Sequence, residues 1–254
     1  IGRVNNLAPG DANGDKLGAF LNAPGDTNVR PTYKTGGLNG HSYAKFDEGG
    51  DTSCLRGGNF DGVDSTTTGG IAADVFSNLD YNMTERTIFI MTKCDDADAS
   101  TVEYLFQMWG SDDGNINVSK RESIAKYINS GADANKLLYF RYDNSGNNFP
   151  NFSPSVYSDS QIDTAAKLIS SRNRWDGGGL STGDLQFWLN DNENINTWNW
   201  YTTPTYMNLQ SGNNDYNRPT VSIGAYTNGD GAASVNAWDG DIYEIIVFNR
   251  ALTD

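Results

Sequence analysis

Histidine and cysteine are nearly absent from the 254-residue chain, which has one histidine, His41, and two cysteines, Cys54 and Cys94. One histidine excludes a zinc site with several histidine ligands, and two cysteines exclude both a four-cysteine zinc site and a disulfide-rich scaffold. The pair allows either one disulfide or two buried thiols, and sequence spacing does not decide between them. No catalytic motif surrounds His41, so we interpret it as a surface residue at a strand edge.

Basic residues and long apolar runs are also scarce. Lysine and arginine number 18 against 32 aspartates and glutamates, which gives a net charge of −14 and a pI near 4.3. Such an acidic chain repels phosphate backbones, so we expect no nucleic-acid partner. No run of 18 apolar residues occurs, so we expect no segment inserted in a membrane.

Glycine and aromatic residues are abundant, with 28 glycines and 12% aromatics. This composition favours β-structure with long turns, and the length suits one large domain. We predict a single domain over 1–254, with an irregular wrapping segment at 1–30 and a two-sheet antiparallel β-sandwich over 31–254. The predicted strands are 41–46, 52–55, 86–93, 103–109, 137–142, 184–190, 220–226 and 241–249.

One segment is ambiguous between helix and strand. Ser119-Lys-Arg-Glu122 has the pattern of a capping box, and Ile124, Tyr127 and Ile128 follow at helical spacing. The same residues could also form a strand, so we expect at most one short helix in the sandwich.

The C-terminal segment reads Trp238-Asp-Gly-Asp-Ile-Tyr-Glu-Ile-Ile-Val-Phe-Asn-Arg-Ala-Leu252. It resembles the closing strand of laminin-G-like domains of the concanavalin A-like lectin/glucanase superfamily. Two further blocks follow the family's order: 31–47, which contains Gly37-Leu-Asn-Gly40, and 185–190, after which Asp191 replaces the family's glycine. The resemblance implies a jelly-roll sandwich, a fold that hosts lectins, glycosidases, lyases and inert spacers.

Glycosidases of this superfamily use carboxylates on one face of a central strand, and the nearest match is Asp239, Asp241 and Glu244. Strand alternation places Glu244 on the face opposite Asp241 unless a bulge intervenes. The segment also resembles the closing strand and not the catalytic one. We therefore predict a chain that is not an enzyme.

Clustered acidic turns suggest calcium, which prefers six to eight oxygen ligands. One candidate site combines Asp241 with Asp47 and Asp51, because jelly-roll binding folds often hold a structural calcium near their terminal strands. The second candidate is Asp11-Ala-Asn13-Gly-Asp15, which begins like an EF-hand loop. It then departs from that motif, with Lys16 in place of glycine.

Sugar sites pair flat aromatic rings with amide and carboxylate hydrogen-bonding groups. Two segments that we expect to be loops have this mixture: 194–206, and Trp175 with the glycines that follow it. The candidate ligand-binding residues are Trp175, Trp198, Asn199, Trp200, Tyr201 and Tyr206.

Two functions therefore compete. The first is a non-catalytic, extracellular or surface-exposed module that binds a glycan, with calcium support. The second is a structural or adhesion protein of a virion, fibre or cell-surface assembly that acts through contacts with other proteins and can oligomerise.

Overall fold

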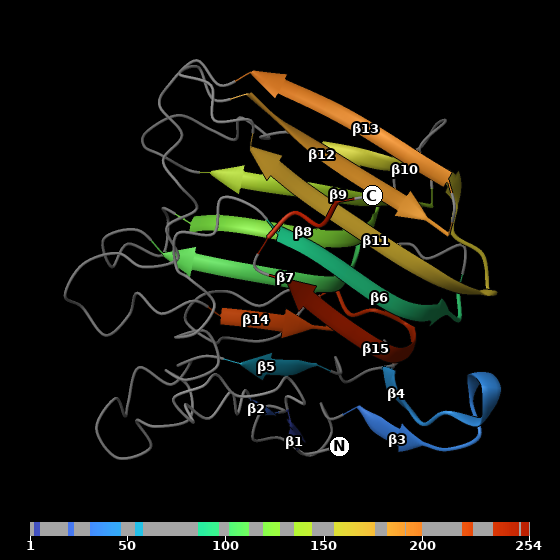
Figure 1. The fold of residues 1–254 in the computed structure, drawn as a ribbon. Helices are drawn as coiled ribbons and strands as arrows, with labels where there is room; N and C mark the ends of the chain where they lie inside the picture. Colours follow the sequence, from blue (N-terminus) through green and yellow to red (C-terminus); the bar gives the residue numbers. More distant parts are fainter. Residues whose placement is uncertain are drawn as a thin grey trace, which may run out of the picture.

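The computed structural model describes residues 3–5, 20–22, 31–46, 54–57, 86–96, 102–111, 119–127, 135–143, 155–175, 182–190, 192–199, 220–225, 236–248 and 250–253. They form two sheets packed face to face, and every described strand pair is antiparallel (Figure 1). The predicted antiparallel β-sandwich is therefore confirmed. Within the described residues, no helix is long and apolar enough to cross a membrane.

The eight-stranded sheet has the order β1 (Arg3–Asn5), β2 (Phe20–Asn22), β5 (Leu55–Gly57), β14 (Thr220–Ile223), β7 (Glu103–Ser111), β8 (Ser119–Tyr127), β9 (Lys136–Asp143) and β10 (Ser155–Gln161). The seven-stranded sheet has the order β13 (Asn192–Asn199), β12 (Thr182–Leu189), β11 (Ala166–Trp175), β6 (Arg86–Cys94), β15 (Gly240–Phe248), β4 (Tyr43–Phe46) and β3 (Thr32–Lys34). A short 3-10 turn, η2, spans Leu38–Gly40.

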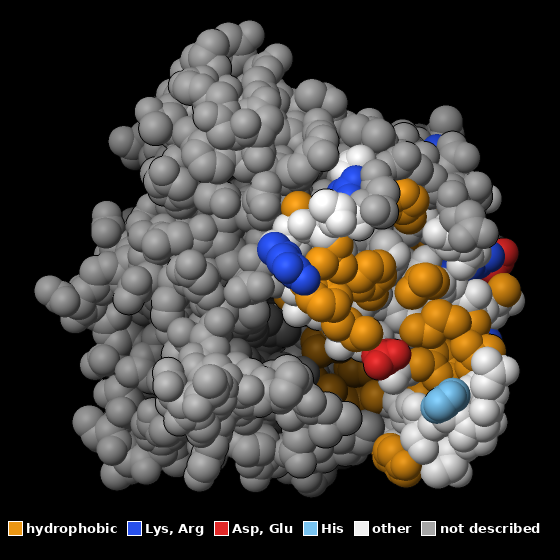
Figure 2. Space-filling model, viewed as in Figure 1, with side chains coloured by type: hydrophobic (Ala, Val, Ile, Leu, Met, Phe, Trp, Pro, Cys, Tyr) orange, Lys and Arg blue, Asp and Glu red, His pale blue; other side chains and the backbone are white. Residues whose placement is uncertain are grey.

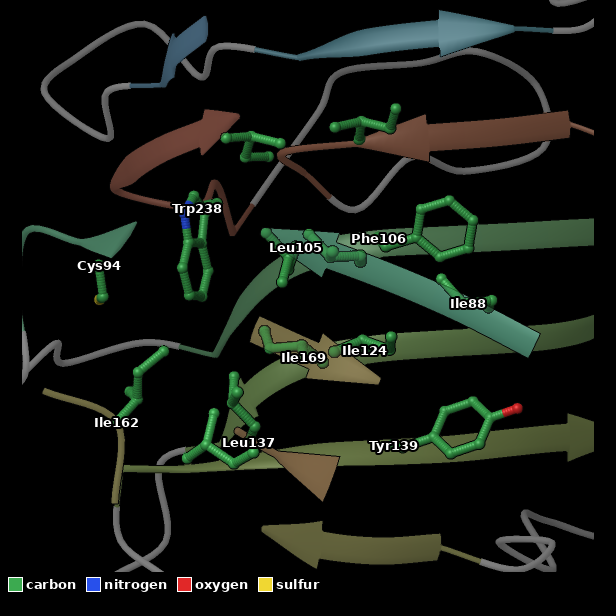
Figure 3. Packing of buried hydrophobic residues seen from close by; sticks show 14 of the residues in the cluster. Ile88, Cys94, Leu105, Phe106, Ile124, Leu137, Tyr139, Ile162, Ile169 and Trp238 are labelled. Carbon is green, nitrogen blue, oxygen red and sulfur yellow. The ribbon is translucent and has the colours of Figure 1, made fainter. Parts of the chain in front are cut away.

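The apolar core lies between the sheets because strand alternation gives each sheet one apolar face. One register-paired row of the eight-stranded sheet contains Leu55, Ile223, Phe106, Ile124 and Tyr139, all of them buried. Tyr139 stacks on Phe187 of the opposite sheet with ring centroids 6.0 Å apart. Figure 3 shows part of this core, including Phe106, Ile124 and Tyr139. Burial of each apolar side chain contributes roughly 1.5–3 kcal/mol.

The ambiguous segment is strand β8, so the helical alternative is wrong. Ile124 packs in the core between the sheets, while its neighbour Ala125 packs with Leu138 on the outer face. A strand buries both faces in this way, whereas a helix would turn only one stripe inward. The predicted wrapping segment 1–30 also contributes strands β1 and β2, which extend the eight-stranded sheet at one edge.

The outer face of the seven-stranded sheet carries an apolar patch (Figure 2). Leu168 and Ile246 are exposed there, with fractions of 41% and 40%. The residues after β15 cross the same face, where Thr87 Oγ1 donates to the Arg250 carbonyl and accepts from the Leu252 amide. The two cysteines are buried thiols and His41 is exposed.

Candidate functional site

Two of the predicted ligand-binding residues come together in the seven-stranded sheet. Trp175 of β11 pairs in register with Gly183 of β12, and Gly183 pairs with Trp198 of β13. Residues paired directly in register lie on the same face of a sheet. The three positions, called the tryptophan row below, therefore place two tryptophans on one face with a residue lacking a side chain between them.

The neighbouring row on the same face has an asparagine at each end and a leucine between them. Asn173 pairs with Leu185, and Leu185 pairs with Asn196, each two residues along its strand from the tryptophan row. Because side chains alternate with period two, these positions share the face of the tryptophans. This asparagine row gives each tryptophan an asparagine neighbour on its own strand.

The tryptophan row lies beyond the apolar core. It shares a face with Ile169, which is in the core and precedes Trp175 by six residues on β11. Strands β9, β11 and β13 all end at this side of the sandwich, at the left of Figure 1.

The eight-stranded sheet is also polar at this end. On its core-side face, register pairs Glu122 with Arg141 and Lys120 with Asp143. Placing four charged residues in an apolar interior would cost several kcal/mol per unpaired ion. Register therefore places charged residues on the core-side face of the eight-stranded sheet and tryptophans and asparagines on that of the seven-stranded sheet at this end.

The structure corrects the predicted surroundings of these tryptophans. Trp175 ends strand β11, and Trp198 and Asn199 end strand β13, so neither segment is a loop at these positions. Residues 192–197 alternate asparagine with other residues, and this period-two pattern fits a strand. Trp200, Tyr201 and Tyr206 lie outside the described residues.

Among the predicted calcium ligands, only Asp241 is described, and it is 5% exposed. Its Oδ1 lies 4.0 Å from Lys45 Nζ, and its Oδ2 accepts a hydrogen bond of 3.4 Å from the Tyr243 hydroxyl. Lys45 also pairs with Asp95 and lies 3.9 Å from Asp239. Within the described part of the chain, no group of three acidic, histidine or cysteine side chains could hold a metal ion. Asp11, Asn13, Asp15, Asp47 and Asp51 lie outside it.

A β-bulge overturns the alternation argument at Glu244. Asp241 pairs with Lys93 and Glu244 pairs with Met91, so three residues along β15 advance only two along β6. Asp241 and Glu244 therefore share the outer face of the sheet instead of lying on opposite faces. Glu244 is exposed, whereas Asp241 lies beside the Lys45 ammonium.

A buried charged cluster sits at the opposite end of the core and was not predicted from the sequence. Lys126 Nζ lies 2.8 Å from Glu103 Oε1, and both side chains are fully buried. The same ammonium lies 3.4 Å from the Cys94 sulfur and 6.0 Å from the centre of the Trp238 ring. Burial raises the pKa of the Cys94 thiol, so it stays protonated near neutral pH.

Sequence reasoning also missed Gly183 and the two asparagines of the asparagine row. Asn192, Asn194, Asn196 and Trp198 stand at every second position, and this spacing could have indicated a strand with all four residues on one face. The buried lysine and glutamate gave no such signal, because they pair across strands β7 and β8 and are not neighbours in the sequence.

The sequence matches no protein-family model and no curated protein. Among solved structures, a CBM40 of Ruminococcus gnavus IT-sialidase bound to α2,3 sialyllactose is 11% identical, with 87% of this chain and 94% of that chain covered and a TM-score of 0.48. An alginate lyase Aly36B mutant in complex with alginate tetrasaccharide is 12% identical, with 92% and 88% covered and a TM-score of 0.45.

A third similar structure is the full-length tailspike protein 2 from Escherichia coli O157:H7 bacteriophage CAB120. It is 10% identical, with 89% of this chain and 25% of that chain covered and a TM-score of 0.46. No TM-score among these three reaches 0.5, and a likeness at this level is not evidence of a shared function.

Proposed function

We propose that this chain is a non-catalytic carbohydrate-binding module, and that the tryptophan row is its binding face. The observation that carries the proposal is the register of Trp175, Gly183 and Trp198. Sugars present C–H faces that stack on aromatic rings and hydroxyls that bond to amides. The register brings tryptophan and asparagine, the residue types that provide these two kinds of group, to neighbouring positions of the sheet.

The proposal includes a place in the concanavalin A-like superfamily and an extracellular or surface location. The closing-strand resemblance over 238–252 supports the superfamily. An acidic, asparagine-rich composition suits a protein exposed to salty surroundings.

Replacing either tryptophan with alanine is expected to weaken glycan binding at least about tenfold, because each change removes one stacking surface. A glycan array followed by calorimetry on W175A and W198A measures the effect. The matched control is W188F, because Trp188 lies on the opposite face of the same sheet, where the Arg172 guanidinium sits 5.3 Å from its ring centre. Its affinity should match that of the unmodified chain.

Three outcomes would contradict the proposed site or the proposed function. Binding unchanged in both alanine variants would place the site elsewhere. A large oligomer that binds no glycan would favour the assembly alternative. Cleavage of a bound glycan that is lost in E244Q would make the chain a hydrolase, a possibility that the bulge in β15 reopens.

Calcium support is part of the same proposal, with Asp47, Asp51 and Asp241 as ligands. Calcium at about 100 times its dissociation constant should stabilise the native state by about 2.7 kcal/mol. Chemical unfolding with calcium or with excess chelator measures this difference. It should disappear in a D47N/D51N variant, and magnesium serves as the control cation. Equal stability with calcium and with chelator would remove calcium from the proposal.

A further inference from the structure

The buried charged cluster brings a thiol and an amine from opposite sheets into contact. Cys94 ends β6 of the seven-stranded sheet, and Lys126 belongs to β8 of the eight-stranded sheet. Both side chains are fully buried, and the Cys94 sulfur lies 3.4 Å from Lys126 Nζ. Figure 3 shows Cys94 at this end of the core, together with Trp238. A separation of roughly 3–3.5 Å is typical of atoms that are well placed to react with each other.

Glu103 supplies a proton acceptor for the amine. Its Oε1 lies 2.8 Å from Lys126 Nζ, and the two residues pair in register across β7 and β8. An ammonium group has no free electron pair and cannot attack a sulfur atom. A carboxylate at hydrogen-bond distance can take its proton and leave a neutral amine. Both groups are then uncharged, and burial favours uncharged groups.

The cluster lies close to an exposed part of the chain. The backbone carbonyl of Asp96 accepts a hydrogen bond of 2.9 Å from the Cys94 thiol and a second one from the Lys126 ammonium. Asp96 itself is exposed. The sulfur is therefore one hydrogen-bonded neighbour away from an exposed residue, which is a short distance for a molecule as small as hydrogen peroxide.

The other cysteine has different surroundings. Cys54 is also fully buried, but it packs in a small apolar cluster with Ala225 and Ala237. Neither alanine side chain carries a nucleophile or a proton acceptor. Cys54 is therefore a matched control for the chemistry of Cys94.

We propose that hydrogen peroxide converts Cys94 and Lys126 into a covalent sulfur–nitrogen crosslink. In the first step the thiol sulfur attacks the peroxide and breaks its O–O bond, which gives a sulfenic acid and water. The sulfur loses two electrons, and they reduce the peroxide. In the second step Glu103 takes one proton from the ammonium and the amine attacks the sulfur. The sulfenic hydroxyl then leaves as water with a second proton from the nitrogen.

The crosslink ties the two sheets together at this end of the sandwich. It closes a loop between positions 94 and 126, which restricts the unfolded chain and stabilises the folded one. Because burial raises the pKa of the Cys94 thiol, little thiolate is present near neutral pH and the first step is slow. The crosslink is therefore expected to accumulate over hours of exposure to peroxide. It is independent of the proposed glycan site.

Peptide mapping of the peroxide-treated full chain by mass spectrometry tests the proposal. Trypsin should release the peptide that begins at Cys94 joined to a peptide that is uncleaved after Lys126. The joined pair should be about 2 Da lighter than the sum of its two parts, because two hydrogens are lost and no oxygen is retained. A thiol reductant should separate the pair. The unfolding midpoint of the crosslinked chain should lie at least about 5 °C above that of the reduced chain.

Three variants assign the reacting groups. C54S should form the crosslink to the same extent as the unmodified chain, and C94S should form none. K126R keeps a cation beside Glu103, but a guanidinium is not a nucleophile. Its Cys94 should therefore be oxidised further to the sulfinic acid, with a gain of about 32 Da. Where K126R does not fold, the unmodified chain decides the question, because its joined peptides identify both residues directly.

Several results would overturn the proposal. One is a chain in which Cys94 carries oxygen while trypsin still cleaves after Lys126. Another is an unchanged Cys94 in a treated chain whose Met91, which is partly exposed on the outer face, has been oxidised. A crosslink that persists in C94S would place the reaction elsewhere. A joined pair about 14 Da heavier than its parts would replace the sulfur–nitrogen bond with an oxygen bridge.

Discussion

Replacing Glu103 with glutamine is expected to reduce the free energy of unfolding by about 3–5 kcal/mol. The change preserves the shape of the side chain but leaves the Lys126 ammonium without its carboxylate in a fully buried position. The remaining neighbours of Lys126 are the Cys94 sulfur, the Asp96 carbonyl and the face of Trp238, and none of them carries a full negative charge near neutral pH.

The pair also has a pH signature. Burial on its own would lower the pKa of Lys126, but the hydrogen bond and the charge of Glu103 raise it above its ordinary value. The pKa in the folded state is therefore above that in the unfolded state, near 10.4. The stabilisation is complete below about pH 10.4 and is lost as the pH rises through the folded-state pKa. Urea unfolding of the unmodified chain and of K126M between neutral and strongly alkaline pH measures this loss.

Two controls separate the buried pair from a general effect of charge. D163N removes an exposed pair, since Asp163 Oδ2 accepts from Lys167 Nζ at 2.9 Å and its side chain is 60% exposed. It should cost at most about 1 kcal/mol. The double variant E103L/K126M should lose less stability than E103Q, because no unpaired charge remains. A cost for E103Q no larger than that for D163N would contradict the prediction.

The strands that the sequence revealed are those with bulky apolar residues on the core side. Residues 86–93 were predicted as a buried strand and form most of β6, whose Ile88 and Ile90 are fully buried. The strand predicted over 241–249 corresponds to β15, and it was recognised by the apolar residues that begin with Ile242. The spacing of the apolar residues and the enrichment in β-branched residues identify a strand within a short stretch of sequence. The partner strands therefore did not have to be known.

Strand β11 lies inside the seven-stranded sheet but was not predicted, because most of its residues are polar. Ser171 and Arg172 are both buried, although neither residue type favours burial. Arg172 is held by Gln186 of β12 and by the Leu252 carbonyl, which lies 80 residues away in the sequence. Partners this distant leave no trace in a local window of sequence, so no strand was predicted over residues 166–174.

The candidate site could be predicted as residue types but not as an arrangement. Trp175 and Trp198 were chosen separately, as aromatic residues beside polar neighbours. Their pairing depends on the register of β12 between them, which is set by the run of pairs from Ile169–Leu189 to Trp175–Gly183. Register is a property of three strands together, and a slip of one residue would move each tryptophan to the other face.

Replacing Gly224 with alanine is expected to cost about 2–5 kcal/mol, from two separate causes. Gly224 has a φ of +81°, where a residue with a Cβ loses roughly 1–2 kcal/mol. An added Cβ would also lie 2.1 Å from Cδ1 of Phe46, a ring that is fully buried in the core. Overpacking a core position of this kind costs roughly another 1–3 kcal/mol.

A second glycine with the same backbone angle separates the two causes. Gly40 also has a φ of +81°, and an added Cβ there would meet nothing within 4 Å. G40A should therefore cost only the backbone term of roughly 1–2 kcal/mol, so chemical unfolding of the two variants gives the Phe46 clash by difference. In a G224A/F46L double variant, the shorter side chain should recover part of that difference. Equal costs for G224A and G40A would show instead that the Phe46 ring gives way. The contact between β4 and the turn after β14 would then be loosely packed, although the ring is buried.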